Sequence, residues 1–173
     1  MAKRITFSAV SLALTVICLY GASTLPTGRV AALALASLFC ALCVNQYGVR
    51  YGVALYVGAS ILSLLLVPKR LLVVIYILFA GYYPIVKLYI EGLNKLWAEW
   101  LVKVLYFNVI LFVLYMVFKT FFLPHLSSTV VMLALHYLGL IIVALEFLFV
   151  LYDWMLSYMI GYYNQMIRRI KHE

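Results

Sequence analysis

The sequence predicts an all-α fold: an integral membrane bundle of six transmembrane helices, with an amphipathic helix on its inner face and a long C-terminal helix. Of the 173 residues, 68% are hydrophobic and 10% are charged, whereas soluble chains are about 45–50% apolar and about 25% charged. Short polar segments separate apolar runs close to the roughly 20 residues that cross about 30 Å of hydrocarbon as a helix. We therefore expect residues 1–173 to form a single transmembrane domain.

The six predicted spans are apolar runs with polar residues at their ends. Only Asn45 to Gly48 separate the second run from the third, so versions with four or five crossings stay open. The spans are Ile5–Ala22, Val30–Gln46, Gly48–Val67, Leu71–Leu88, Val102–Phe122 and Thr129–Leu151, and helix continues after the last to about Ile170.

The first apolar run follows Lys3 and Arg4, as the apolar part of a signal peptide would. A small-x-small cleavage pattern is poor here, because Tyr20, Gly21 and Ala22 occupy the end of the run. We predict a retained first helix instead of a cleaved signal.

The positions of Lys and Arg predict the orientation. With the N-terminus inside, nine of the 13 basic residues lie on inner segments, and the positive-inside rule then places both termini in the cytoplasm. Contacts with anionic headgroups account for the net charge of +8, so we expect membrane lipids as partners and no nucleic acid. The inner residues are Lys3, Arg4, Arg50, Lys87, Lys95, Lys103, Arg168, Arg169 and Lys171, and the outer ones are Arg29, Lys69, Arg70 and Lys119.

Two features stand between the fourth and fifth predicted spans. Gly81 and Pro84 predict a kink, because proline removes a backbone hydrogen bond and opposes the preceding turn. A charge ladder with i, i+4 spacing follows and predicts an amphipathic helix along the inner membrane face, seated in lipid or docked to a partner helix. Its members are Lys87, Glu91, Lys95, Glu99 and Lys103.

The last helix carries a polar stripe. Glu146 and Asp153 are seven residues apart and fall on nearly one helical face, which continues through Ser157 and Asn164. Ionisable groups at membrane depth are costly, so these residues are functional candidates. The alternative is that Asp153 lies at the inner surface, and that Glu146 pairs with Lys103 or another inner lysine.

Cys40 and Cys43 form a CxxC pair in the second span. Residues three apart share a helical face, which raises the hypothesis of a thiol oxidoreductase. Such enzymes need a second cysteine pair, whereas the remaining cysteine here is Cys18. The alternative is that both cysteines are small residues that let helices approach closely.

Other chemistry is not indicated by the sequence. His125, His136 and His172 are far apart and form no two-ligand motif, so we expect no metal and no cofactor. The serines lack a GxSxG or Ser/His pattern, and no paired carboxylate motif is present. We therefore predict no catalytic residues and a protein that is not an enzyme.

The opening segment KRITFSAVSLALTV, with Ala9 and Ala13 as an AxxxA pair, resembles the first helix of the substrate-binding S components of energy-coupling factor (ECF) transporters. Small residues four apart let another helix pack at short range. The resemblance implies a bacterial inner-membrane subunit that binds a vitamin or related micronutrient. Such a subunit docks through its first helices, here Ala9 and Ala13, onto a transmembrane coupling subunit driven by two cytoplasmic ATPases.

The resemblance also implies where a small-molecule ligand would bind. S components hold the ligand in the outer half of the bundle, under the loops that join the spans. The residues of this chain expected there are Tyr20, Arg29, Tyr76, Tyr115, Lys119, His125 and His136.

A second class of function stays open, a membrane scaffold or assembly protein similar to the rod-shape protein MreD, which would bind other proteins. A closed polar and aromatic cavity in the outer half would favour transport, whereas a solid core of Leu, Val and Phe would favour a scaffold.

Overall fold

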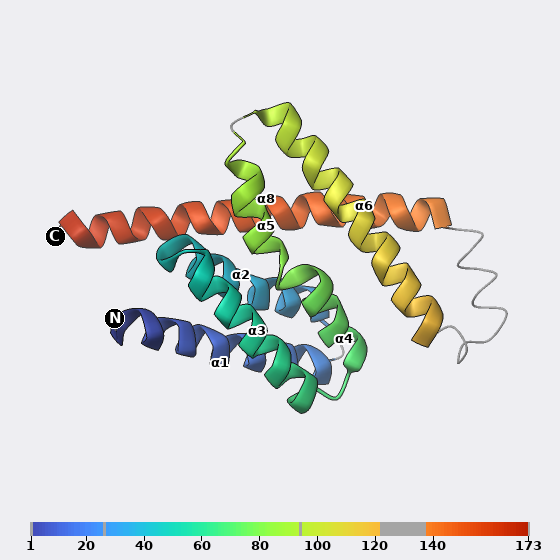
Figure 1. Ribbon diagram of the computed structural model, residues 1–173, viewed down its shortest axis with the longest axis horizontal. Coiled ribbons are helices and arrows are strands. Elements are labelled where there is room, and N and C mark those ends of the chain that lie inside the picture. Colours follow the sequence, from blue (N-terminus) through green and yellow to red (C-terminus); the bar gives the residue numbers. More distant parts are fainter. Residues whose placement is uncertain (1, 26, 94, 122–137, 173) are drawn as a thin grey trace. The chain divides into compact units, whose positions relative to one another are not determined.

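The computed structural model describes residues 2–25, 27–93, 95–121 and 138–172. All regular structure in these ranges is helical: α1 (Ala2–Thr24), α2 (Arg29–Tyr47), α3 (Val49–Leu66), α4 (Arg70–Ile75), η1 (Tyr76–Ala80), α5 (Tyr83–Glu91), α6 (Leu96–Phe121) and α8 (Leu138–His172) (Figure 1). They form two compact units. Unit 1 contains residues 1–93 and 156–173, and unit 2 contains residues 94–155, so α8 contributes to both.

In unit 1, α1, α2 and α3 pack against one another. Gly48 separates α2 from α3 and has φ of +90°, a conformation that side chains with a Cβ rarely adopt. Its N–H donates to the carbonyl of Val44, 2.9 Å away, which ends α2 and starts α3 at once. This turn explains how the single residue Gly48 suffices between two complete helices.

The interior of unit 1 contains a buried cluster of small and branched hydrophobic side chains, and buried serines and Thr15 lie in the same unit. Leu19 and Ala22 come from α1, Ala36 and Cys40 from α2, and Leu55 from α3, and all belong to one buried cluster. Alanine and cysteine at these positions let the helix axes approach closely. Tyr76, which is fully buried, closes the cluster from the fourth segment.

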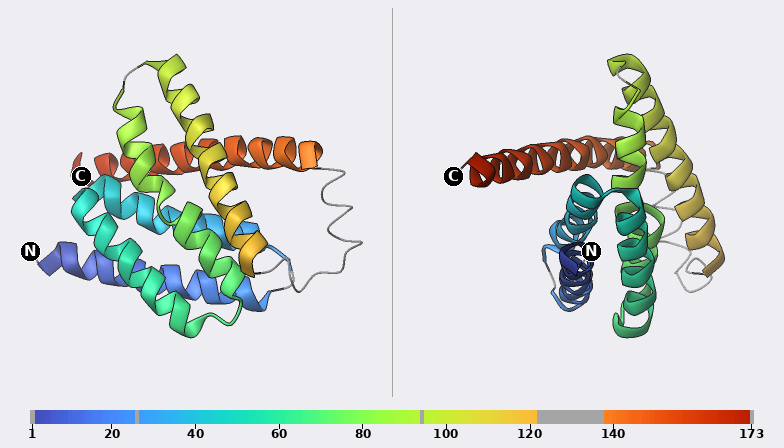
Figure 2. Two further views of the ribbon diagram at one scale, coloured as in Figure 1. Left: turned by 45° about the vertical axis from the view of Figure 1, so that its right-hand side comes forward. Right: turned by 60° about the vertical axis from the view of Figure 1, so that its left-hand side comes forward.

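The fourth segment is interrupted, as Gly81 and Pro84 predict. The helix changes from α4 to the π-helix η1, whose last bond runs from the Gly81 N–H to the Tyr76 carbonyl at 2.7 Å. A turn at Gly81 and Tyr82 follows, and Pro84 then lies in the first turn of α5, where its missing N–H costs no hydrogen bond. Figure 2 shows α4 and α5 as separate pieces of one chain segment.

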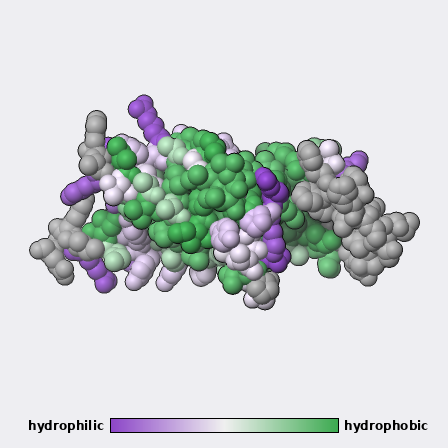
Figure 3. Space-filling model, turned by 90° about the horizontal axis from the view of Figure 1, so that it is seen from below, coloured by the Kyte–Doolittle hydropathy of each residue, from purple (hydrophilic) through white to green (hydrophobic). Residues whose placement is uncertain are grey.

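Six helical segments of the described chain are long and apolar enough to cross a membrane, which agrees with the six predicted runs. The long C-terminal helix is also confirmed: the 35 residues of α8 extend about 52 Å. Its predicted beginning at Thr129 lies outside the described residues. On the face shown in Figure 3, hydrophobic surface is broad and strongly hydrophilic residues form small separate groups.

The predicted amphipathic helix through the charge ladder is wrong. α5 ends at Glu91, residues 92 and 93 form a turn, and α6 begins at Leu96 as the start of a long apolar helix. Lys87 and Lys103 are 2% and 5% exposed, so neither lies on a solvated face. The i, i+4 spacing is the same whether charges face water or polar groups on other helices, which explains the error.

Candidate functional site

The polar stripe of α8 makes side-chain hydrogen bonds to other helices. In unit 2, the carboxylate of Asp153 accepts a hydrogen bond from the ammonium of Lys103 on α6, with Nζ and Oδ2 2.7 Å apart. Both side chains are buried, and the Lys103 ammonium also lies 5.7 Å from the centre of the Trp100 ring. A charged pair in this environment is stable only when both charges are compensated.

Glu146 occupies a different environment two helical turns away on α8. Its Oε1 accepts a hydrogen bond of 3.2 Å from the side-chain amide of Asn108 on α6. The structure contradicts the alternative in which Glu146 pairs with Lys103, because Lys103 pairs with Asp153 instead. Between these two polar contacts, the rings of Phe107 and Phe149 stack with centroids 4.4 Å apart.

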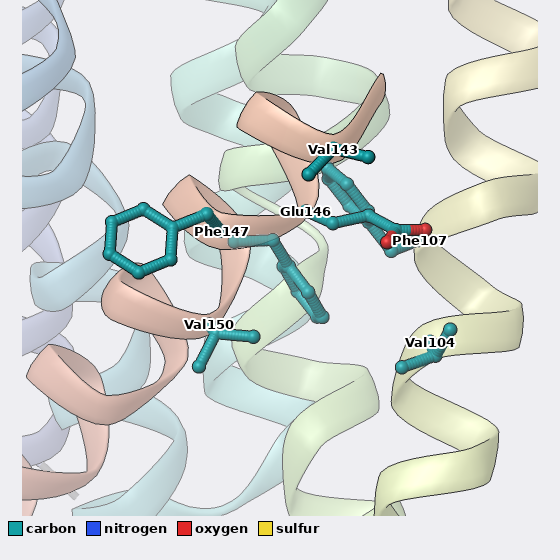
Figure 4. Close-up of a pocket in the computed structure, with 7 residues that line it drawn as sticks. Val104, Phe107, Val143, Glu146, Phe147 and Val150 are labelled. Carbon is teal, nitrogen blue, oxygen red and sulfur yellow. The ribbon is translucent and has the colours of Figure 1, made fainter. Parts of the chain in front are cut away.

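A pocket of about 270 Å³ lies between α6 and α8 at this level. In Figure 4, the carboxylate of Glu146 points from α8 toward α6, beside Phe107. Glu146 is the one charged residue in its lining, and the others are apolar: Val104, Phe107, Val143, Phe147, Phe149 and Val150.

In unit 1, Ser157 continues the stripe by accepting a hydrogen bond from the ammonium of Lys87 on α5, at 2.8 Å. Lys87 also forms an ion pair of 2.6 Å with Glu91, one turn further along α5. The position of Lys87 one turn before a helix end allows its charge to meet an acid of its own helix and a hydroxyl of α8.

The stripe ends with two contacts between neutral side chains. Asn164 accepts a hydrogen bond of 2.7 Å from Asn45 at the end of α2, and the hydroxyl of Tyr163 donates to Gln46 at 2.9 Å. Each of the four predicted stripe residues therefore has a polar partner on another helix. This arrangement fixes the register of α8 and places one carboxylate, Glu146, in an apolar pocket.

The structure places the predicted ligand residues at separate positions. Tyr20 is exposed on α1, and Arg29 is exposed at the start of α2, where its Nε donates to the carbonyl of Leu25 at 3.2 Å. Tyr76 is fully buried in η1. In unit 2, Tyr115 and Lys119 are both exposed on α6, and His125 and His136 lie outside the described residues. None of the described ones lines the pocket at Glu146.

Ala9 and Ala13 lie together on an exposed face of α1. Large apolar side chains accompany them on the exposed surface of α1, including Val10 and Ile17. The opposite face carries Thr15, which is fully buried and donates to the Ser11 carbonyl at 2.8 Å. The AxxxA pair is therefore not used in the packing of unit 1.

Both cysteines of the CxxC pair are buried free thiols of α2, with different neighbours. Cys40 donates to the carbonyl of Gly81 at 3.4 Å, which satisfies a backbone group exposed by the helix interruption. Cys43 lies 3.4 Å from the hydroxyl of Ser8 on α1. Both contacts are between closely packed helices, as expected for small residues in a bundle.

Three residues of the site were not identified from the sequence. The charge ladder predicts Lys87 and Lys103 on the inner membrane face, and Asn108 lies inside the predicted span Val102–Phe122 with no role assigned to it. The sequence could have identified Asn108, because a side-chain amide in the middle of a membrane span requires a polar partner. Within the described ranges, no three His, Cys, Asp or Glu side chains lie close enough together to hold a metal ion.

No family model matches the chain, and no curated protein or solved structure is significantly similar to it. The structure defines its class at a coarser level. The described chain is all-helical and has six helices long and apolar enough to cross a membrane, which indicates a multi-pass membrane protein.

Proposed function

We propose that this chain is the small-molecule-binding subunit of an ECF-type uptake transporter in a bacterial inner membrane, with both termini in the cytoplasm. The ligand would be a vitamin or related micronutrient, and a coupling subunit with its ATPases would supply the energy. The observation that supports the proposal is the exposed face of α1 with Ala9 and Ala13. The resemblance of the opening segment gives this face the role of docking the coupling subunit.

The physical argument concerns the distance at which a second helix can pack. At Ala9 and Ala13, a helix that approaches α1 meets no side-chain atom beyond Cβ, so the two backbones can come close there and gain van der Waals contact. Two leucines at these positions would hold the second helix away. Because both alanines are exposed, the substitutions would leave the interior of unit 1 intact.

The outer-half residues keep the ligand role that the resemblance implies: Tyr20, Arg29, Tyr76, Tyr115, Lys119, His125 and His136. Tyr20 and Arg29 lie near the connection from α1 to α2, which agrees with a ligand held under an outer loop.

The experiment is native mass spectrometry of the protein purified from its own membrane. We expect the wild type to retain a small molecule and to co-purify with a larger membrane subunit and ATPases. The Ala9→Leu/Ala13→Leu variant should lose these proteins and keep the small molecule. As a matched control, Ala54→Leu/Ala144→Leu adds the same side chains at exposed positions of α3 and α8 and should retain both.

The packed interior of unit 1 favours a second candidate, an MreD-like scaffold. Its buried cluster is formed by Leu, Val, Ile, Ala and Cys side chains with Tyr76, and such a core suits a protein that binds other proteins through its surface. Purification with cell-wall assembly proteins and without a small molecule would support the scaffold and contradict the transport proposal. Unchanged co-purification in the Ala9→Leu/Ala13→Leu variant would remove the docking argument.

A further inference from the structure

The pocket between α6 and α8 contains a carboxylate whose charge is not balanced within the described chain. The partner of Glu146 is the neutral amide of Asn108, and no Lys, Arg or His of the described ranges forms an ion pair with it. Lys103, the nearest basic residue along α6, is paired with Asp153. A carboxylate without a cation is costly in an apolar environment, so the pocket favours a positively charged ligand.

The depth of the pocket argues against a lipid headgroup as that ligand. The apolar part of α6 runs from Leu96 to Val117, and Phe107 lies near its middle, about 16 Å of helix from either end. Since the hydrocarbon layer is about 30 Å thick, Phe107 and Glu146 would lie near its centre. The ammonium group of a phospholipid remains at the membrane surface.

The lining also argues against a metal ion. Divalent cations such as Mg²⁺ and Ca²⁺ take six or more oxygen ligands, whereas the pocket offers one carboxylate among valines and phenylalanines. Aromatic rings attract organic cations through their negative faces, and apolar walls suit a hydrocarbon body. Phe107, Phe147 and Phe149 belong to the pocket lining, and Figure 4 shows Phe107 beside the carboxylate of Glu146.

We propose that this pocket is a binding site for a small organic ammonium ion with an apolar body. The Glu146 carboxylate is the counter-ion, the Asn108 amide orients that carboxylate, and the phenylalanine rings and valines contact the rest of the ligand. The site lies within unit 2 and does not depend on docking through α1. The ligand inference is therefore tested independently of the transport proposal.

The test uses the full chain in lipid nanodiscs and tritiated benzyltrimethylammonium as the probe, with empty nanodiscs as the background. We expect saturable binding to the wild type. Unlabelled benzyltrimethylammonium should displace the probe, whereas neopentylbenzene, which has the same shape with carbon in place of the charged nitrogen, should be at least about tenfold weaker.

Two variants of the pocket and one control variant identify the residues that bind the probe. Glu146→Gln keeps the shape and the capacity to bond Asn108 but removes the charge, and should weaken binding at least about tenfold. Glu99→Gln makes the same change on α6 outside the pocket lining and should bind as the wild type does. Val104→Trp fills the pocket from α6 without changing Glu146 and should abolish binding.

Four results would overturn the inference: no saturable binding to the wild type, equal displacement by both compounds, unchanged binding by Glu146→Gln, or binding that survives Val104→Trp. An unchanged Glu146→Gln variant would mean that the charge of Glu146 does not contribute to binding. If Glu146→Gln does not fold, as judged by circular dichroism, Val104→Trp decides, and binding that survives Val104→Trp also contradicts the proposal.

Discussion

Breaking the Lys103–Asp153 pair one partner at a time tests whether the polar stripe holds α8 in place. The Nζ and Oδ2 atoms are 2.7 Å apart, and the side chains are 7% and 6% exposed. With an effective dielectric constant of about 20, their attraction is roughly 6 kcal/mol. The desolvation of two ions, at several kcal/mol each, offsets this attraction, so the pair contributes little net stability relative to an apolar pair.

Removal of one partner has a different consequence, because the other charge stays buried. We expect Lys103→Met and Asp153→Leu each to lower the free energy of unfolding by about 3–5 kcal/mol. The double variant replaces both charges with apolar groups and should lie within about 1 kcal/mol of the wild type, or above it. The two single effects should therefore be strongly non-additive.

The assay is unfolding in mixed micelles by titration with sodium dodecyl sulfate, followed by circular dichroism at helical wavelengths. The matched control is the cycle of Lys95→Met and Glu99→Gln, two charges of the same ladder for which no ion pair is found in the described chain. Each control variant should change stability by less than about 0.5 kcal/mol. Additive single effects at Lys103 and Asp153, each below about 1 kcal/mol, would refute the reasoning.

Two further predictions concern the packing of unit 1. Gly52→Ala would press a Cβ against the side chain of Val44, which as a stiff β-branched residue yields little, and should lower the free energy of unfolding by about 1–3 kcal/mol in the same titration. At Gly161 a Cβ meets no atom within 4 Å, so equal losses for Gly52→Ala and Gly161→Ala would contradict the close approach. Ser8→Cys should form a disulfide with Cys43 on oxidation in a protein whose other cysteines are alanine, because the Ser8 hydroxyl lies 3.4 Å from that sulfur. Ala9→Cys, one residue further along and exposed, should remain reduced in the same gel-shift assay, and cross-linking of both would argue against the α1–α2 packing.

The sequence was sufficient to predict the structural features that depend on residues close together along the chain. Six apolar runs predicted six helices, since span length follows from composition alone. Gly81 and Pro84 predicted the interruption of the fourth segment, because both act on the local backbone. The stripe from Glu146 to Asn164 followed from helical periodicity, although its partners did not.

The errors arose where the answer depends on distant parts of the chain. Lys87 contacts Ser157, which is 70 positions away, and no local pattern distinguishes such a lysine from one on a solvated face. One alternative from the sequence paired Lys103 with Glu146, but the register of α6 and α8 brings Lys103 to Asp153 instead. One helical turn changes the depth of a side chain by about 5.4 Å, and side-chain packing sets that register.

Glu146 differs from the other residues of the stripe because its partner does not neutralise its charge. Asp153 meets a full positive charge, Ser157 accepts from an ammonium, and Asn164 meets an amide of its own kind. Glu146 meets an amide, which satisfies one oxygen but leaves the negative charge in place. If the only role of this residue were to fix the register of α8, glutamine would serve with a smaller desolvation penalty. Its uncharged amide makes the same hydrogen bond without burying an unbalanced charge. The carboxylate is therefore the part of the stripe that structure alone does not explain, and it is also the part that faces a pocket.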